Sequence, residues 1–162
     1  LAFSANGVNL VNVTTADEMY DVCINKFEQT HITIMAAAVA DYTPINKADE
    51  KIKKNEGSLN VELTNTKDIL KALGEKKKKG QILVGFALET NNEEAFANQK
   101  LKEKNADLIV LNSLNDTGAG FGYDTNKITI FEKGGKVYKF ETKSKSEVAK
   151  DIIDTITQLY YA

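Results

Sequence analysis

The sequence contains no arginine and no tryptophan, and all 21 of its basic residues are lysines. A lysine ammonium is a point charge. It lacks the fork with which a guanidinium binds two oxygens of a phosphate or carboxylate. Any phosphate that this protein binds must therefore be held by ammonium groups and by backbone N–H groups.

Cysteine, histidine and proline each occur once, as Cys23, His31 and Pro44. A single cysteine excludes a disulfide within the chain and fits a reducing compartment, so we expect a cytoplasmic protein. A lone histidine forms neither a metal cluster nor a catalytic triad by itself. No apolar run approaches the roughly 18 residues of a membrane span. No secretory signal is evident, so neither a membrane protein nor a secreted one is predicted.

The composition is that of an ordinary globular domain, with 42% hydrophobic and 27% charged residues. The formal net charge is −2, so no bulk electrostatic field draws the chain to nucleic acid or to an anionic membrane. A length of 162 residues suits one domain with its own core. We therefore expect a single domain over residues 1–162.

Continuous apolar runs predict strands that are buried on both faces, as in parallel sheets. They are Ile32–Ala38, Gln81–Ala87 and Leu108–Leu111. Two shorter strands are predicted at 10–13 and 59–63, the latter from alternating apolar and polar residues. Two apolar segments, 128–131 and 137–140, flank Gly134 and Gly135 and predict a β-hairpin.

Helices are predicted between these strands. Two S/T-x-x-E capping boxes, 15–18 and 144–147, each indicate a helix start. A further helix is predicted at 93–104, and Thr66 is a candidate cap for a short helix through Leu73. Strands that alternate with helices indicate an α/β protein. We expect a Rossmann-like three-layer fold with a mainly parallel central sheet and a C-terminal β-hairpin.

One stretch, 35–54, has the features of a ligand site. The apolar run stops at Asp41, a loop follows, and Lys51, Lys53 and Lys54 come next. In open α/β sheets ligands bind at the carboxyl ends of the strands, which is where this order places the charges. An ordinary strand followed by a solvated basic loop explains the pattern equally well.

Five motifs occur in order along the chain: A-A-A-V-A-D-Y, E-K-I-K-K, L-V-G-F-A-L-E-T-N-N, Q-K-L-K-E-K-N-A-D-L-I-V-L-N and G-A-G-F. Together they resemble the phosphopantothenoylcysteine synthetase (phosphopantothenate–cysteine ligase) family of coenzyme A biosynthesis. The resemblance runs from about Asn12 to the last helix. The family begins with a glycine-rich strand–loop–helix unit that has no counterpart here, so the resemblance implies an N-terminally incomplete domain.

The resemblance implies a reaction that joins 4'-phosphopantothenate and cysteine through an acyl-nucleotidylate. It implies a nucleoside triphosphate as co-substrate, with CTP favoured over ATP, and Mg²⁺ bridging phosphate oxygens. It also implies a homodimer, and in most bacteria a fusion to a phosphopantothenoylcysteine decarboxylase.

The resemblance also assigns roles to individual residues. Lys51 matches a lysine that contacts the activated phosphate and the acyl intermediate. Lys100 and Lys104, four residues apart on one helix face, match two lysines that meet the triphosphate. Asn112 is carried over as a substrate-binding residue, and the loop Gly118–Phe121 recurs without an assigned role. The other positions matching nucleotide-binding residues are Met35, Ala36, Ala37, Asp41, Lys67, Asp68, Ile69, Leu70 and Phe86.

Two other functions remain open from the sequence. A Rossmann-type oxidoreductase normally carries G-x-G-x-x-G at the start of a helix, and that motif is absent here. A non-catalytic nucleotide-binding or dimerisation fragment is the other alternative, with the hairpin 127–141 as a candidate dimer contact.

Overall fold

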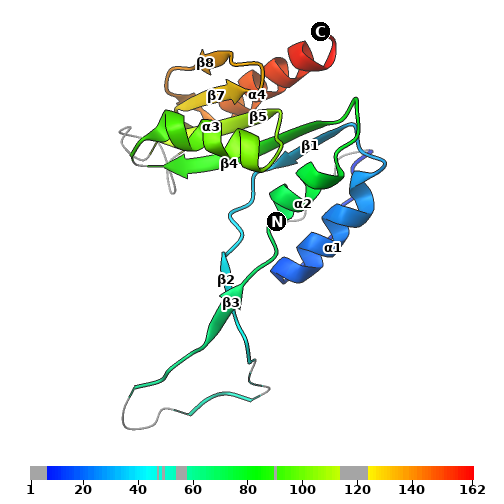
Figure 1. The fold of residues 1–162 in the computed structure, drawn as a ribbon. Helices are drawn as coiled ribbons and strands as arrows, with labels where there is room; N and C mark the ends of the chain where they lie inside the picture. Colours follow the sequence, from blue (N-terminus) through cyan, green and yellow to red (C-terminus); the bar gives the residue numbers. More distant parts are fainter. Residues whose placement is uncertain (1–6, 47, 49, 54–57, 90, 114–123) are drawn as a thin grey trace.

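A five-stranded sheet forms the centre of the molecule and carries helices on both faces (Figure 1). The computed structural model describes residues 7–46, 48, 50–53, 58–89, 91–113 and 124–162. Its helices are α1 (Ala16–Phe27), α2 (Ile69–Lys76), α3 (Glu93–Glu103) and α4 (Lys145–Tyr160). Its strands are β1 (Ile32–Met35), β2 (Tyr42–Pro44), β3 (Leu63–Asn65), β4 (Ile82–Glu89), β5 (Leu108–Ser113), β6 (Thr125–Asn126), β7 (Ile128–Glu132), β8 (Val137–Lys139) and β9 (Lys143–Ser144).

The central sheet has the strand order β1-β4-β5-β7-β8. Strands β1, β4 and β5 are parallel, whereas β7 runs antiparallel to β5 and β8 antiparallel to β7. The β7–β8 pair is the hairpin predicted around Gly134 and Gly135. The predicted Rossmann-like fold with a mainly parallel sheet is therefore confirmed.

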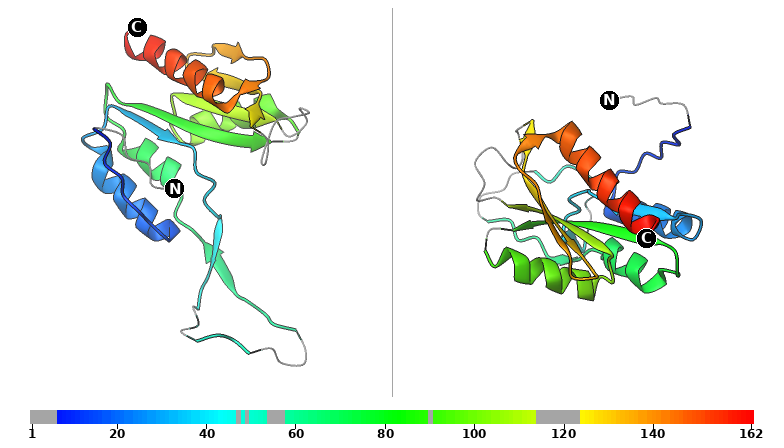
Figure 2. Two further views of the ribbon diagram at one scale, coloured as in Figure 1. Left: turned by 180° about the vertical axis from the view of Figure 1, so that it is seen from behind. Right: turned by 90° about the horizontal axis from the view of Figure 1, so that it is seen from above.

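Successive side chains along each strand point to opposite faces of the sheet, so they contribute to different parts of the core. In β4, Val84 belongs to a cluster that includes Ile152 and Ile156 of α4. Leu83 points to the other face and packs with Phe27 of α1 and with residues of α2. Helix α3 covers the same face as α1 and α2, next to β5. Seen from above, α4 lies on one side of the sheet and α2 and α3 on the other (Figure 2). Among the described residues, no helix is both long enough and apolar enough to span a bilayer.

Three predicted boundaries were wrong. Residues 10–13 and 59–62 form no strand, and β1 ends at Met35 rather than Ala38. A strand needs a hydrogen-bonded neighbour, and the segment 10–13 has no strand partner among the described residues; Leu10 stays 61% exposed. In the segment 59–62 the Glu62 carbonyl accepts a 3.0 Å hydrogen bond from the Ile45 N–H, but the regular pairing of β2 with β3 begins only at Leu63. The predicted cap of α2 also moves, because Asp68, not Thr66, is its N-cap.

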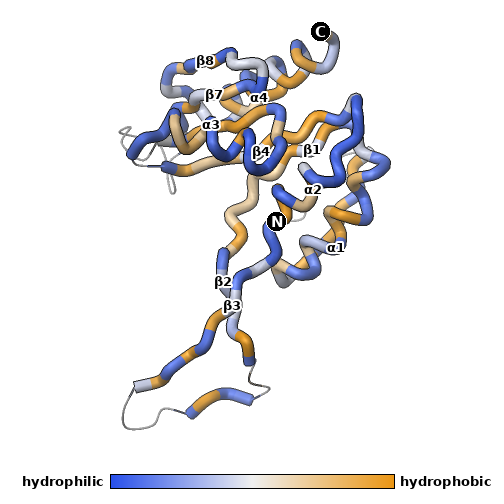
Figure 3. Tube along the Cα trace, in the orientation of Figure 1, coloured by the Kyte–Doolittle hydropathy of each residue, from blue (hydrophilic) through white to orange (hydrophobic). Residues whose placement is uncertain are grey.

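A two-stranded arm projects from the body of the molecule. Strands β2 and β3 pair antiparallel, and the described residues between them, 45–46, 48, 50–53 and 58–62, extend further from the central sheet (Figure 1). Several residues of this arm are apolar, drawn as orange segments of the tube in Figure 3, and their side chains are exposed. They include Ile45, Ile52, Leu59 and Val61, each at least 55% exposed.

Helices α2 and α3 approach each other closely where α3 ends. A Cβ atom built on Gly74 would lie 1.8 Å from the carbonyl oxygen of Lys104, so only glycine fits there without a shift of backbone. The side-chain amide of Asn105 donates a hydrogen bond of 2.8 Å to the Gly74 carbonyl. This contact fixes α2 against α3, the two helices that carry predicted nucleotide-binding residues.

An ion pair joins the other end of α2 to α3. The Lys104 ammonium lies 2.7 Å from Oδ2 of Asp68, and Oδ1 of Asp68 accepts a 2.8 Å hydrogen bond from the Lys71 N–H as the helix cap. Partial burial raises the pKa of Asp68. The bonds from Lys104 and Lys71, with the charges of Lys104 and Lys100, outweigh that effect and lower the pKa below its ordinary value.

Replacing Gly74 with alanine tests the close approach. In an open helix this change stabilises a protein by about 0.5–1 kcal/mol. Here the added methyl group meets backbone, so we expect destabilisation of about 1–3 kcal/mol, measured by urea unfolding followed by circular dichroism. A Gly74→Ala variant as stable as the parent would contradict the close contact.

Asp68 gives a prediction for the dependence of stability on pH. A carboxyl whose pKa is lower in the folded state stabilises the protein above its unfolded pKa of about 3.9, and this stability disappears as the pH falls through the folded pKa. Because the pair is partly exposed, we expect its contribution to be at most about 1 kcal/mol.

The Asp68→Asn variant keeps a good helix cap and should lose less stability than the parent between pH 5 and pH 3 in urea titrations. Glu75→Gln, an exposed change on the same helix, is the control and should follow the parent. Parallel acid profiles for Asp68→Asn and the parent would rule out the assigned role of the ion pair.

Candidate functional site

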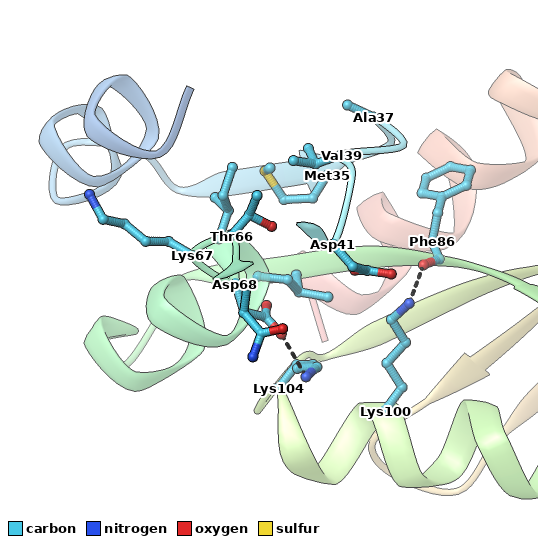
Figure 4. A pocket seen from close by; sticks show the side chains of 13 residues that line it. Met35, Ala37, Val39, Asp41, Thr66, Lys67, Asp68, Phe86, Lys100 and Lys104 are labelled. Carbon is cyan, nitrogen blue, oxygen red and sulfur yellow. Dashed lines mark hydrogen bonds and ion pairs between the residues drawn. The ribbon is translucent and has the colours of Figure 1, made fainter. Parts of the chain in front are cut away.

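A cavity of about 480 Å³ opens beside the carboxyl end of β1 and the second half of β4 (Figure 4). This is the edge at which open α/β sheets bind ligands. Three separate segments line it: residues 35–41 after β1, residues 65–70 at the start of α2, and Phe86 with α3. The fold therefore brings together parts of the chain that are up to about seventy residues apart in the sequence.

Hydrogen bonds between the segment before β2 and the segment after β3 set the position of Asp41. The Thr66 N–H donates to the Asp41 carbonyl at 2.9 Å, and the Thr66 hydroxyl donates to the Ala40 carbonyl at 2.6 Å. These bonds close the base of the arm and hold the exposed Asp41 carboxylate at the cavity, as labelled in Figure 4.

Two lysines, Lys100 in α3 and Lys104 directly after its last residue, border the cavity about one helical turn apart. The Lys100 ammonium donates a 2.9 Å hydrogen bond to the Phe86 carbonyl, and the Lys104 ammonium pairs with Asp68. Figure 4 draws both contacts as dashed lines. Both lysines are half-buried, so their positive charges lie in partly desolvated surroundings, where electrostatic attraction is stronger than in water.

Lys67 is oriented differently. Its ammonium lies 3.2 Å from the Asp17 carboxylate and 4.8 Å from the centre of the Tyr20 ring, both on α1. The hydrogen bond that the Lys67 ammonium donates to the Asp17 carboxylate raises the pKa of Lys67. The side chain points away from the cavity in Figure 4, so Lys67 borders the cavity while its charge is neutralised elsewhere.

Lys51 lies apart from Lys100 and Lys104. It follows β2 on the arm, is exposed, and does not line the cavity. Lys54 and the loop Gly118–Phe121 lie outside the described residues.

Most of the predicted nucleotide-binding residues meet in this one cavity. They are Met35, Ala37, Asp41, Lys67, Asp68, Ile69, Leu70, Phe86, Lys100 and Lys104. Ala36 and Asn112 instead line an adjoining cavity. Sequence reasoning missed Val39, Asn65 and Thr66 in the first cavity. The sequence indicated Thr66 only as a possible helix cap, and no sequence pattern pointed to Val39 or Asn65.

The arrangement suits an anionic ligand with a planar or apolar part. The lining combines the ammonium groups of Lys100 and Lys104 with the apolar residues Met35, Val39 and Phe86. Among the described residues, no cluster of three or more histidine, cysteine or acidic side chains is placed to hold a metal.

Known proteins share this sequence and fold. Residues 2–160 match the model of the DNA/pantothenate metabolism flavoprotein C-terminal domain. The chain is 50% identical over 158 residues to a cysteine/cysteine sulfinic acid decarboxylase from an unknown prokaryotic organism, covering 98% of this chain and 44% of that protein. It is 46% identical over 149 residues to the coenzyme A biosynthesis bifunctional protein CoaBC of Bacillus subtilis (strain 168), covering 92% of this chain and 36% of that protein.

The crystal structure of the C-terminal domain of a CoaBC protein superposes with a TM-score of 0.74 at 38% identity, covering 92% of this chain and 64% of that one. The chain thus spans less than half the length of the two curated relatives. The match over nearly all of its residues confirms the family relationship that the five motifs indicated. The chain belongs to the DNA/pantothenate metabolism flavoprotein C-terminal domain family.

Proposed function

We propose that this chain carries the site of a ligase that joins 4'-phosphopantothenate and cysteine, with CTP rather than ATP as the activating nucleotide. The observation that carries the proposal is the pair of ammonium groups of Lys100 and Lys104 at the cavity. The similarity to CoaBC proteins supports the same reaction. The names of those relatives also support a decarboxylase portion in the same protein, and the single cysteine fits a cytoplasmic location.

A carboxylate does not react with an amine directly, because oxide is a poor leaving group. In the proposed reaction, a carboxylate oxygen of 4'-phosphopantothenate attacks the α-phosphorus of the nucleotide, and the bond to pyrophosphate breaks. The cysteine amine then attacks the acyl carbon. A C–N bond forms, the bond to the nucleotide breaks, and the amine releases a proton. No protein nucleophile is needed.

The chain's own contribution is charge neutralisation and positioning. Lys100 and Lys104 offset the negative charge of the triphosphate, and Phe86 and Met35 provide an apolar surface for the base. Asp41 is exposed at the same cavity, and one carboxylate together with phosphate oxygens is a usual ligand set for Mg²⁺. Mg²⁺ bound at this position would offset negative charge on the phosphate oxygens.

Lys51 is proposed to contact the activated phosphate, which requires the arm to approach a cavity.

The arm also supports a homodimer. A two-stranded ribbon is marginally stable by itself, and this one exposes Ile45, Ile52, Leu59 and Val61. A second copy of the chain would bury these side chains. The hairpin 127–141 is the alternative dimer contact, because its strand β8 forms one edge of the central sheet.

Nucleotide titration tests the role of Lys100. By isothermal calorimetry with Mg²⁺, we expect saturable CTP binding that is stronger than ATP binding. Lys100→Met keeps the aliphatic stem and removes the charge, so it should weaken CTP binding by about ten-fold or more. Lys102→Met, on the same helix but outside the cavity, is the matched control. Equal losses in both variants, or no CTP binding by the parent, would refute the proposal.

Light scattering after gel filtration tests the arm. The parent should elute as a dimer, and Val61→Lys, a change at an exposed arm position, should shift it towards the monomer because a charge would enter an apolar contact. Val137→Lys on β8, 43% exposed, should leave the dimer intact. The reverse result would place the contact on the hairpin.

A further inference from the structure

The two lysines of the first cavity differ in their electrostatic surroundings. The Lys100 ammonium donates its 2.9 Å hydrogen bond to a neutral group, the Phe86 carbonyl. The Lys104 ammonium instead lies 2.7 Å from the Asp68 carboxylate (Figure 4). Lys100 therefore presents an uncompensated positive charge to the cavity, whereas the charge of Lys104 is neutralised by a side chain of the protein itself.

The Asp68 carboxylate has a fixed position at the cavity. Its Oδ1 accepts a 2.8 Å hydrogen bond from the Lys71 N–H, because Asp68 is the N-cap of α2. The dipole of a helix also stabilises negative charge at its N-terminus. These interactions do not involve Lys104, so the carboxylate stays where it is whether or not the ammonium is bound to it.

Lys104 can leave Asp68 through rotation of its side chain alone. Its backbone is fixed at the end of α3, because its N–H donates to the Lys100 carbonyl at 3.0 Å and its own carbonyl lies against Gly74. The ammonium sits on a flexible four-carbon stem, and the side chain is 20% exposed to water. Breaking the ion pair therefore requires no movement of α2 or α3.

Short and long phosphate ligands meet this arrangement differently. A single phosphate finds an uncompensated cation at Lys100 and can bind there without disturbing the ion pair. A chain of phosphates that extends about one helical turn further reaches Lys104, and it gains that ammonium only when the ammonium leaves Asp68. The carboxylate left behind then lies close to phosphate oxygens and repels them. The ion pair therefore acts mainly against polyphosphates.

We propose that Asp68 is an internal competitor for phosphate at Lys104, which weakens the binding of polyphosphates and favours the release of pyrophosphate. Asp68 holds the ammonium in the empty site, gives it up when a triphosphate binds, and takes it back as pyrophosphate leaves. This inference rests on the proposed ligase function and adds to it a contact that sets the affinity for nucleotide and product.

Calorimetric titration with CTP, pyrophosphate and CMP tests the competition. Asp68→Asn removes the negative charge and keeps a good helix cap. Because the ion pair is partly exposed, we expect this variant to bind CTP and pyrophosphate about three- to five-fold more tightly than the parent. The Kd for CMP should stay unchanged. If Asp68 instead held Lys104 ready for the phosphate, the same variant would bind CTP more weakly.

Two controls accompany this titration. Glu75→Gln removes one negative charge from an exposed position on the same helix, outside the cavity, and should change none of the three Kd values. Pyrophosphate and CMP are titrated in EDTA without Mg²⁺, so that any binding of a metal by Asp68 does not contribute.

A double-mutant cycle shows whether Asp68 acts through Lys104. Lys104→Met keeps the aliphatic stem and removes the ammonium for which carboxylate and phosphate compete. In the Lys104→Met background, Asp68→Asn should therefore change the Kd for CTP by less than about two-fold. A gain of the same size in both backgrounds would mean that Asp68 only repels the ligand, and it would overturn the proposal.

The outcomes separate this inference from the proposed function. Unchanged or weaker binding of CTP and pyrophosphate in Asp68→Asn would overturn the competition and leave the nucleotide site standing. An equal gain for CMP would also overturn it, because a single phosphate at Lys100 does not require Lys104. A parent chain that binds neither CTP nor pyrophosphate would overturn the ligase function itself.

Discussion

The contact between α2 and the end of α3 determines the geometry of the site. Lys104 touches both ends of α2: its carbonyl lies against Gly74, and its ammonium pairs with Asp68. A side chain at position 74 would push the two helices apart. The residues of α2 and α3 that line the first cavity would then separate. The same backbone contact that packs the helices therefore sets the width of the predicted nucleotide site.

Lys100 connects the two cavities. It borders both, and its ammonium is held by the Phe86 carbonyl on β4. A reaction between a carboxylate and a nucleotide needs two anionic ligands to meet, and their mutual repulsion must be offset where they touch. A cation at the shared boundary acts on both ligands, whereas Lys104 borders the first cavity and Lys145 the second.

The sequence was most informative where burial dictates composition. The cores of β4 and β5 were predictable because strands covered on both faces must be apolar throughout, and the spacing of Lys100 and Lys104 placed them on one helix face. The failures involve partners remote in sequence. The pairing of Lys104 with Asp68, 36 residues apart, leaves no local pattern. Asn126 and Lys145 line one cavity because the β6–β9 ladder joins their segments, and two residue pairs are too short for any periodicity in the sequence. The segment 10–13 has the composition of a strand but pairs with no strand in the part of the chain that the structure describes.

The absence of arginine affects how such a site exchanges partners. In the structure, Lys104 is neutralised by Asp68, so an incoming phosphate must compete with a carboxylate for this ammonium. A guanidinium that binds a carboxylate through two parallel hydrogen bonds loses that planar geometry when it changes partners. An ammonium has no such geometry to lose, so it changes partners more easily. Asp68 also tolerates the exchange, because its other oxygen remains bonded to the Lys71 N–H and its side chain is 45% exposed to water. Neither group is left buried and unpaired, so the ion pair that positions Lys104 can open at little cost when an anionic ligand enters.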